Sequence, residues 1–262
     1  MSSPRLTYYN ISPDTVAFST TRHGGVSTGN YASLNINPYC GDAPEAVAAN
    51  RLRLAAELGV DEGRIVLPHQ THGTETRVID GGFMLLTANE RQRLLDGVDA
   101  VLTDVPGLCI GVSTADCIPV LLYDAEHRAA AAVHAGWRGT QARILQKAVS
   151  GMCAVYGTEP ARLKAVIGPG ISLDSFEVGD EVYAAFEEAG FDMGAIAARR
   201  AKWHIDLPLA NRLQLTRCGV DEANITTLGT CTYANADEYF SARRLGTASG
   251  RIYTGIYIKT GG

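Results

Sequence analysis

The sequence lacks several features that would assign a class of protein at once. No stretch of its 262 residues approaches the roughly 20 consecutive apolar positions that a membrane-spanning helix needs. The first ten residues also lack the basic-then-apolar order of a signal peptide. We therefore expect a cytoplasmic protein with no membrane partner. The net charge of −5 argues against a nucleic-acid-binding protein, which normally presents a basic face.

Dense cysteine spacing and repeats are missing as well. The six cysteines form no CxxC pair and are widely scattered, which argues against a disulfide scaffold and a zinc ribbon. We find no internal repeat, no low-complexity tract and no Pro/Gly-rich linker, so residues 1–262 are predicted to form a single domain. Gly168-Pro169-Gly170 does not open a GxGxxG turn, so a dinucleotide-binding fold is not expected.

The sequence does contain enough apolar material for a core, with 46% hydrophobic and 19% charged residues. Strands are predicted over residues 11–20, 64–68, 74–79, 100–103, 109–112, 118–123, 129–133 and 163–167, and again within 226–259. Helices are predicted over residues 42–58, 140–155, 180–188 and 207–218, with Asp42 and Thr140 as N-caps of the first two. Because strands and helices alternate without a strict βαβ rhythm, we predict an α/β (α+β) fold of mixed sheets flanked by helices.

Two neighbouring apolar runs bring a cysteine and a histidine together. Residues 118–123 and 129–133 flank the polar stretch 124–127, a natural connection between antiparallel strands. With the turn centred on Ala125 and Glu126, Cys117 lies directly opposite His134, with Cβ atoms roughly 5 Å apart. A small error in the turn would move the pair onto a diagonal and keep it close.

A thiol facing an imidazole supports three interpretations. Both side chains can ligate zinc, the histidine can activate Cys117 as a nucleophile, or the pair is a half-buried contact without chemistry. The segment after His134 favours a functional site. Its glycines permit close backbone approach, and a helix start at Thr140 with Arg138 nearby can hold an anion.

A third metal ligand is expected among the remaining histidines. His69 and His72 lie in a loop after a short strand, and we expect one of them to point to the site. His23 is a weaker candidate, His127 is expected in a solvated turn, and His204 in a packed position. Two histidines and one cysteine with an open fourth position would be typical of catalytic zinc.

Several short motifs follow one another along nearly the whole chain. They are Thr21-Arg22-His23-Gly24-Gly25-Val26-Ser27, Ser33-Leu34-Asn35, Gln70-Thr71-His72-Gly73, Thr114-Ala115-Asp116-Cys117, His134-Ala135-Gly136-Trp137-Arg138-Gly139, Ile167-Gly168-Pro169, Phe176-Glu177-Val178-Gly179, Asp206-Leu207, Asn211, Ser241-Ala242-Arg243-Arg244, Thr247 and Arg251. Together they resemble the YfiH/laccase-domain family, also called the polyphenol oxidoreductase or peptidoglycan editing factor family. No single motif would suffice, but the set is specific.

The resemblance implies an αββα sandwich related to toxin-type cysteine hydrolases, with zinc on His72, Cys117 and His134. It implies purine nucleoside phosphorolysis, of adenosine, inosine and methylthioadenosine, together with adenosine deamination. The partners are then a purine nucleoside and phosphate. We expect catalytic roles for Asp116, Cys117 and Arg138. Candidates for binding substrate or phosphate are Arg22, Asn35, Thr140, Arg243 and Arg244.

The sequence leaves three other functions open. Cys117 and His134 could act as nucleophile and base of an amidase that edits a peptidoglycan precursor. A copper polyphenol oxidase is less expected, because the six histidines form no HxH pair. A zinc-stabilised binding protein would need a fourth ligand, such as His69 or Cys231. The oligomeric state, monomer or homodimer, is not decided by the sequence.

Overall fold

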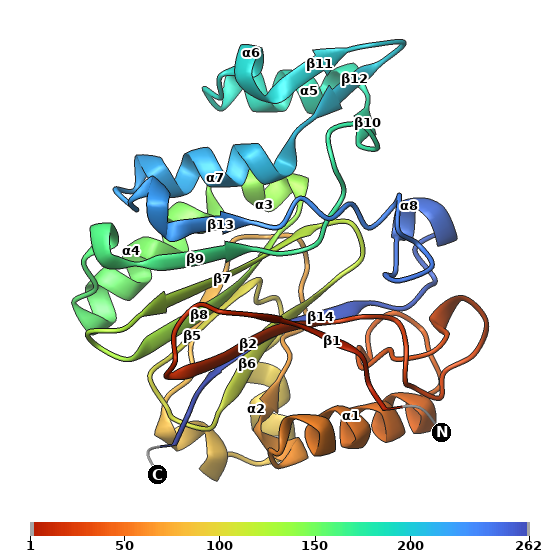
Figure 1. Cartoon of the computed structure of the whole chain (residues 1–262), viewed down its shortest axis with the longest axis vertical. Helices are drawn as coiled ribbons and strands as arrows, with labels where there is room; N and C mark the ends of the chain where they lie inside the picture. Colours follow the sequence, from red (N-terminus) through yellow and green to blue (C-terminus); the bar gives the residue numbers. More distant parts are fainter. Residues whose placement is uncertain (1–2, 261–262) are drawn as a thin grey trace.

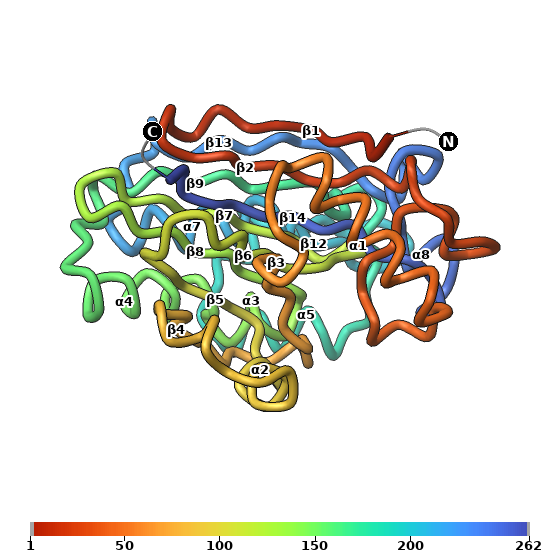
Figure 2. Tube along the Cα trace, turned by 90° about the horizontal axis from the view of Figure 1, so that it is seen from below, coloured from red at the N-terminus to blue at the C-terminus, as the bar shows by residue number. Residues whose placement is uncertain are grey.

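Two large mixed β-sheets pack face to face at the centre of the computed structural model, which describes residues 3–260 (Figure 1). The first sheet has the strand order β1 (Leu6–Tyr9), β2 (Thr15–Thr20), β14 (Ile252–Ile258), β6 (Cys109–Thr114), β3 (Ile65–Val66). The second has the order β13 (Ile225–Thr227), β9 (Lys164–Ile167), β7 (Ile118–Asp124), β8 (Ala129–Ala135), β5 (Ala100–Thr103), β4 (Thr76–Val78). Figure 2 shows the two strand orders running in the same direction across the molecule.

Helices cover the outer faces of both sheets. Helix α1 (Pro44–Leu58) packs on the first sheet, and α4 (Ile144–Tyr156) and α7 (Leu207–Arg217) pack on the second (Figure 1). The predicted αββα sandwich of mixed sheets is therefore confirmed. The remaining helices are α2 (Ala88–Leu94), α3 (Trp137–Gln141), α5 (Asp180–Glu188), α6 (Met193–Ile196) and α8 (Ala242–Leu245). Helices α5 and α6 lie beside a small antiparallel sheet of β10 (Glu177–Val178), β12 (Trp203–Ile205) and β11 (Ala197–Arg199).

The two central strands β7 and β8 are buried on both faces, and their side chains alternate between two cores. Val120 and Val133 face the layer of α4 and α7. Leu121 and Ala132 face the first sheet, in the core between the two sheets. By this alternation His134 belongs to the face between the sheets, at the carboxyl end of β8. The site described below therefore lies at one end of the central core.

The predicted hairpin forms, but its register differs from the prediction by two residues. His134 pairs with Pro119, and Asp124 pairs with Ala129, so the connection has four residues instead of two. The Asp124 carboxylate stabilises this longer loop by accepting hydrogen bonds from the backbone N–H of Glu126, at 2.9 Å, and of His127, at 3.3 Å. Because the shift is an even number of residues, Cys117 stays on the same face as His134, on the diagonal.

Both predicted helix caps are wrong. Helix α1 has Ala43 at its N-cap, and the Asp42 carboxylate instead accepts from Ser27 and Asn35. Thr140 lies inside the short helix α3, and α4 begins separately after Arg143, which has a left-handed φ of 66°. The predicted strand 11–20 is also too long, because only Thr15–Thr20 pairs in the sheet.

None of the helices within residues 3–260 combines the length and the apolar character that crossing a bilayer requires.

Candidate metal centre

Three side chains from three separate segments meet at the end of the central core. His72 comes from the loop after β3, Cys117 from the turn between β6 and β7, and His134 from the end of β8. Their ligand atoms all lie within 4.8 Å of one another, and the two imidazole rings meet edge to face at a centroid distance of 4.9 Å. The three residues that the family resemblance implies, two of which also follow from the hairpin, are thus brought together.

The Asp99 carboxylate connects the end of β8 with the loop that carries His72. Its side chain is fully buried, and its Oδ1 accepts from Nδ1 of His134 at 2.7 Å and from the backbone N–H of His72 at 3.0 Å. The second oxygen accepts from the N–H groups of Gly73, at 2.8 Å, and Thr71, at 3.2 Å. Because Nδ1 of His134 donates to Asp99, the lone pair on Nε2 is the one left for a ligand.

The His72 loop is fixed on its other side by Gln70. The Gln70 side chain donates to the carbonyl of Ser113 at 2.9 Å and accepts from its N–H at 2.8 Å, as the backbone of a neighbouring strand would. Strand β3 ends at Val66, so this amide continues the pairing of β6 beyond the end of its neighbour. His72 itself has a left-handed φ of 62°, a conformation that the anchoring of its loop by Asp99 and Gln70 must stabilise.

Electrostatics favour the ionised forms of the cysteine and of His134. Burial acts to raise the pKa of the Cys117 thiol, but the charge and hydrogen bonding of His134, and of His72, outweigh it and lower the pKa to about 6. Burial acts to lower the pKa of His134, but Cys117 and Asp99 raise it to about 9. The pKa of Asp99 is lowered, because the bonds from His134 and from Gly73 and Thr71 outweigh its burial. Without a metal, the pair is therefore thiolate and imidazolium at neutral pH.

Gly136 leaves room for the three ligands. A Cβ at this position would lie 3.1 Å from Sγ of Cys117 and 3.1 Å from Cδ2 of His72. These contacts are shorter than ordinary van der Waals contact, so any side chain here would press on two ligands at once. A side chain at this position would therefore require Cys117 or His72 to shift by a few tenths of an ångström.

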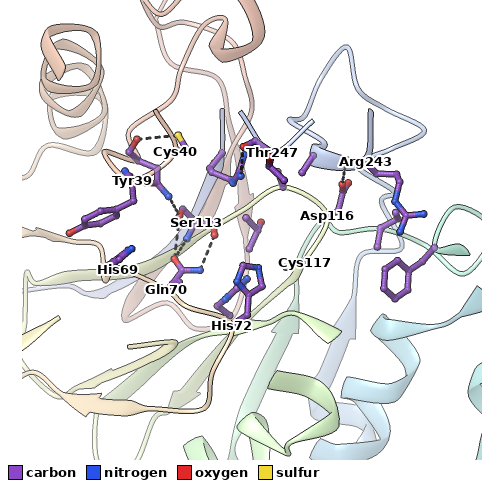
Figure 3. A pocket seen from close by; sticks show the side chains of 18 residues that line it. Tyr39, Cys40, His69, Gln70, His72, Ser113, Asp116, Cys117, Arg243 and Thr247 are labelled. Carbon is purple, nitrogen blue, oxygen red and sulfur yellow. Dashed lines mark hydrogen bonds between the residues drawn. The ribbon is translucent and has the colours of Figure 1, made fainter. Parts of the chain in front are cut away.

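The cluster lies in the wall of a pocket of about 540 Å³ (Figure 3). Tyr39 and His69 are at one end, stacked on each other at a centroid distance of 4.3 Å. Phe176 and Arg243 are among the other residues of the lining, with the Arg243 guanidinium 5.5 Å from the Phe176 ring centroid. The pocket thus combines aromatic and cationic side chains around the cluster, which suits a ligand with an aromatic ring and a negative charge.

The histidine and cysteine considered as a fourth ligand do not join the cluster. Nδ1 of His69 lies 2.7 Å from the exposed carboxylate of Asp96. Cys231 lies against two serines and accepts from the N–H of Ser172 at 3.4 Å. Among residues 3–260 the only group of this kind is His72, Cys117 and His134. A metal held by the cluster would therefore have no fourth ligand from His69 or Cys231.

Five residues expected to bind substrate or take part in catalysis do not line the pocket. Arg22 donates to the carbonyls of Ala32 and Ala236, and Arg138 is exposed and lies over Trp137. The other three are Asn35 and Thr140, both fully buried in hydrogen bonds with protein groups, and Arg244, which lies over Tyr233. Thr140 fails as an anion site because the helix does not start there.

Asp116 and Arg243 do line the pocket, and they are linked. Asp116 accepts from the backbone N–H of Arg243 at 2.7 Å and from the hydroxyl of Thr232 at 2.7 Å. Both carboxylate oxygens therefore already have partners. Asp116 also has a left-handed φ of 86°, directly before Cys117. Its visible role in the structure is to position its neighbours.

Asp99 was not predicted from the sequence, and Arg251, which lines the pocket, was given no role there. Asp99 comes directly before the wholly buried strand β5, and a carboxylate next to such a strand is a signal that it has partners. Arg251 comes directly before the mostly buried strand β14, and a charged side chain at such a position is likewise a signal that it has partners.

The fold places the chain among proteins of the YfiH type. The crystal structure of a hypothetical protein YfiH from Bacillus licheniformis matches it with a TM-score of 0.88 at 27% identity, over 96% of this chain and 99% of that one. A family model described as multi-copper polyphenol oxidoreductase laccase matches residues 16–259. The chain belongs to this family.

Two relatives are similar over nearly their whole lengths. One, from Bacteroides thetaiotaomicron, is named purine nucleoside phosphorylase and is 48% identical over 254 residues, which cover 96% of this chain and 93% of the relative. The other, from an unknown prokaryotic organism, is named adenosine deaminase RL5 and is 45% identical over 93% of this chain and 94% of the relative.

Proposed function

We propose that the chain is a zinc-dependent purine nucleoside phosphorylase that also deaminates adenosine, with adenosine, inosine and methylthioadenosine as substrates. The observation that carries the proposal is the three-ligand cluster of His72, Cys117 and His134 in the wall of a pocket. The names of the two relatives support both activities. Three protein ligands with an open fourth position are typical of catalytic zinc.

The ligand set fits zinc better than copper. Two imidazoles and a thiolate are side chains that zinc prefers, and their ligand atoms lie within 4.8 Å of one another, so His72, Cys117 and His134 would hold the ion. Blue copper usually adds an axial methionine, and no methionine is among the residues that line the pocket. A multicopper oxidase would need further clusters, and residues 3–260 contain one.

The residues of the chain have distinct tasks in this proposal. A zinc ion would supply a Lewis acid that activates water at neutral pH. Asp99 orients His134 and anchors the His72 loop, and Cys117 contributes a thiolate. Asp116 is a positioning residue for Arg243. Arg138 has no task in the proposed reactions, because it lies outside the pocket.

Both reactions act on the same substrate at different atoms. In phosphorolysis a phosphate oxygen bonds to C1′ of the ribose while the bond from C1′ to N9 breaks. The base keeps the electron pair and takes the proton that phosphate gives up. In deamination water supplies the oxygen that replaces the C6 amino group, and ammonia leaves.

The test is an assay of zinc-loaded protein with adenosine and inorganic phosphate. We expect adenine with ribose 1-phosphate, and inosine with ammonia, each in amounts that depend on the metal. A variant with Cys117→Ser serves as the control for contaminating enzymes. If the zinc-loaded protein forms neither pair of products, the proposal is refuted.

One observation favours a second candidate, an amidase that acts on a peptidoglycan precursor. Cys117, His134 and Asp99 form a nucleophile, base and orienting carboxylate, with the thiol pKa lowered to about 6. His72 has no task in such a triad, which is why zinc is preferred. A covalent acyl adduct on Cys117 after incubation with a cell-wall peptide, detected by mass spectrometry, would favour the amidase.

A further inference from the structure

Two arginines flank the loop that leads from α8 into β14. Arg243 lies within α8, and Arg251 is the residue directly before β14. Both line the pocket that contains His72, Cys117 and His134. In Figure 3, Arg243 and Thr247 of this segment lie across the pocket from His72. Among residues 3–260, no salt bridge within 4.0 Å joins either guanidinium to a carboxylate, and both arginines face the pocket.

The Arg251 guanidinium is fixed on one edge and open on the other. Its Nη1 donates to the carbonyls of Ser249, at 2.7 Å, and Gly250, at 3.0 Å, and its Nη2 donates to the carbonyl of Thr247 at 3.0 Å. Within the described part of the chain, Nε has no acceptor and Nη2 has one, so each of these two nitrogens keeps at least one free N–H. Nε and Nη2 lie on the edge of the guanidinium that forms the fork for two oxygens of a phosphate or carboxylate. The loop therefore holds the fork ready for an anion.

Arg251 is also held from its backbone. Its N–H donates to Oδ1 of Asn35 at 3.1 Å, and Asn35 is fully buried. Asn35 was expected to bind substrate directly. Its contacts instead fix the start of β14 and with it the base of the Arg251 side chain.

Arg243 offers a second set of free donors. Its Nη1 donates to the carbonyl of Glu177 at 3.0 Å, and within residues 3–260 no other group of its side chain has an acceptor. Its backbone is fixed by Asp116, whose two oxygens are both taken. Asp116 is the one carboxylate among the residues that line the pocket. The pocket wall therefore has free donors for an anion, and both oxygens of its one carboxylate are engaged by protein donors.

A buried hydroxyl adds a third donor. Thr114, which pairs with Ile252 next to Arg251, lines the pocket and is 1% exposed. Its Oγ1 has no hydrogen-bond partner in the described structure. A buried hydroxyl without a partner is costly, and a ligand in the pocket would relieve that cost.

We propose that Arg251 and Arg243 bind the inorganic phosphate that attacks the nucleoside, beside the cluster of His72, Cys117 and His134. This inference rests on the proposed phosphorolysis. It keeps Arg243 from the candidates expected from sequence and adds Arg251, in place of Arg22, Asn35, Thr140 and Arg244. The Arg251 fork takes two phosphate oxygens, and Arg243 balances the remaining charge. A third oxygen is left to form the bond to C1′, while N9 leaves with the electron pair and the proton.

The test compares phosphorolysis with deamination in zinc-loaded Arg251→Met and Arg243→Met. Loss of hydrogen bonds to a charged group should raise the KM for phosphate about ten- to a hundredfold. Deamination consumes water in place of phosphate, so the ratio of deamination to phosphorolysis should rise by about tenfold or more. Arg251→Lys keeps a point charge without the fork and should give an intermediate KM. Thermal unfolding of each variant checks that the loop still folds.

Arg244→Met is the matched control. It removes the same charge from the same helix, but Arg244 lies over Tyr233 and does not line the pocket. Its KM for phosphate should stay within about twofold of the wild-type value. If Arg251→Met and Arg243→Met also stay within twofold, while the wild type forms ribose 1-phosphate, the inference is overturned.

Direct binding separates this inference from the proposed reaction. Calorimetric titration of the zinc-loaded wild type with inorganic phosphate should give binding that Arg251→Met weakens about tenfold or more. Equal binding by both proteins, or none by the wild type, would overturn the inference whatever the activity. If the wild type converts adenosine 5′-monophosphate faster than adenosine, and both variants erase this preference, the arginines hold a nucleotide phosphate and the inference is also overturned.

Discussion

Asp99 and His134 form a buried pair in which the carboxylate accepts from Nδ1 of the imidazole at 2.7 Å. Asp99 is fully buried and His134 is 3% exposed, so water does not compete for this bond. The same carboxylate holds the His72 loop through three backbone N–H groups. One side chain thus sets the positions of two proposed ligands that are 62 residues apart in the sequence.

This pair makes metal affinity depend on Asp99. In Asp99→Asn an amide replaces the carboxylate, so the bond to Nδ1 loses its charge assistance and the loop N–H groups lose an acceptor. Loss of such an outer partner weakens metal binding by about 10–100-fold. Zinc titration against a chromophoric chelator should show a dissociation constant raised by that factor.

Asp96→Asn is the matched control for this experiment. Asp96 also accepts from a histidine, His69, but the pair is exposed and lies outside the cluster. Its zinc affinity should equal that of the wild type. Equal affinities for Asp99→Asn and Asp96→Asn would show that the carboxylate does not support a metal.

Alkylation of Cys117 tests both its ionisation and its proposed ligation. The pKa of its thiol is lowered from 9.0 to about 6, so the metal-free protein carries the thiolate at pH values above about 6. The rate of reaction with iodoacetamide should therefore rise with pH around a midpoint near 6. Zinc should protect the thiolate and slow the reaction at pH 7.

Cys40 provides an internal comparison, because it lines the same pocket but burial raises the pKa of its thiol. It should react slowly at pH 7 with or without zinc, as peptide mapping can show. A Cys117 rate that zinc leaves unchanged would contradict its role as a ligand.

Gly136→Ala should disturb the cluster without disturbing the fold. The added methyl group would lie 3.1 Å from both Cys117 Sγ and His72 Cδ2, so these two proposed ligands would have to shift by a few tenths of an ångström. Overpacking costs about 1–3 kcal/mol, and here the cost falls on the geometry of the metal site. We expect zinc affinity to fall about tenfold.

Gly81→Ala is the control, because Gly81 has open space around it and the variant should leave zinc affinity unchanged. Equal affinities in the two variants would refute the steric argument.

The hairpin shows how far local sequence can predict a site. The apolar runs correctly indicate β7 and β8, and the face of His134 follows from their alternation. The length of the connection was wrong, because it depends on Asp124 bonds to Glu126 and His127 that compete with a two-residue turn. The error left Cys117 near His134 only because it was an even number of residues.

Contacts distant in sequence were not predictable in this way. Asp99 acts on the His72 loop 27 residues away, and Asn35 fixes Arg251 from 216 residues away. No periodicity encodes such pairs, since the fold alone brings the segments together.

The choice of His72 over His69 as the third ligand depended on the family resemblance, because the local sequence did not decide between them. The Thr140 helix start failed because Arg143 interrupts the helix in a left-handed conformation.

Gln70 offers a test of how the loop that carries His72 is anchored. Its side-chain amide bonds both the N–H and the carbonyl of Ser113, in the place of a strand that ends at Val66. Gln70→Ala removes the partner and leaves the Ser113 groups unsatisfied, at a cost of about 1–3 kcal/mol. Urea denaturation of the metal-free protein should show an unfolding free energy lowered by that amount. The exposed Gln92 in α2 is the control, because Gln92→Ala should change stability by less than about 0.5 kcal/mol.

Zinc affinity should fall in Gln70→Ala as well, since a looser loop must be ordered before His72 can bind. Wild-type stability and wild-type zinc affinity in this variant would show that Asp99 alone anchors the loop.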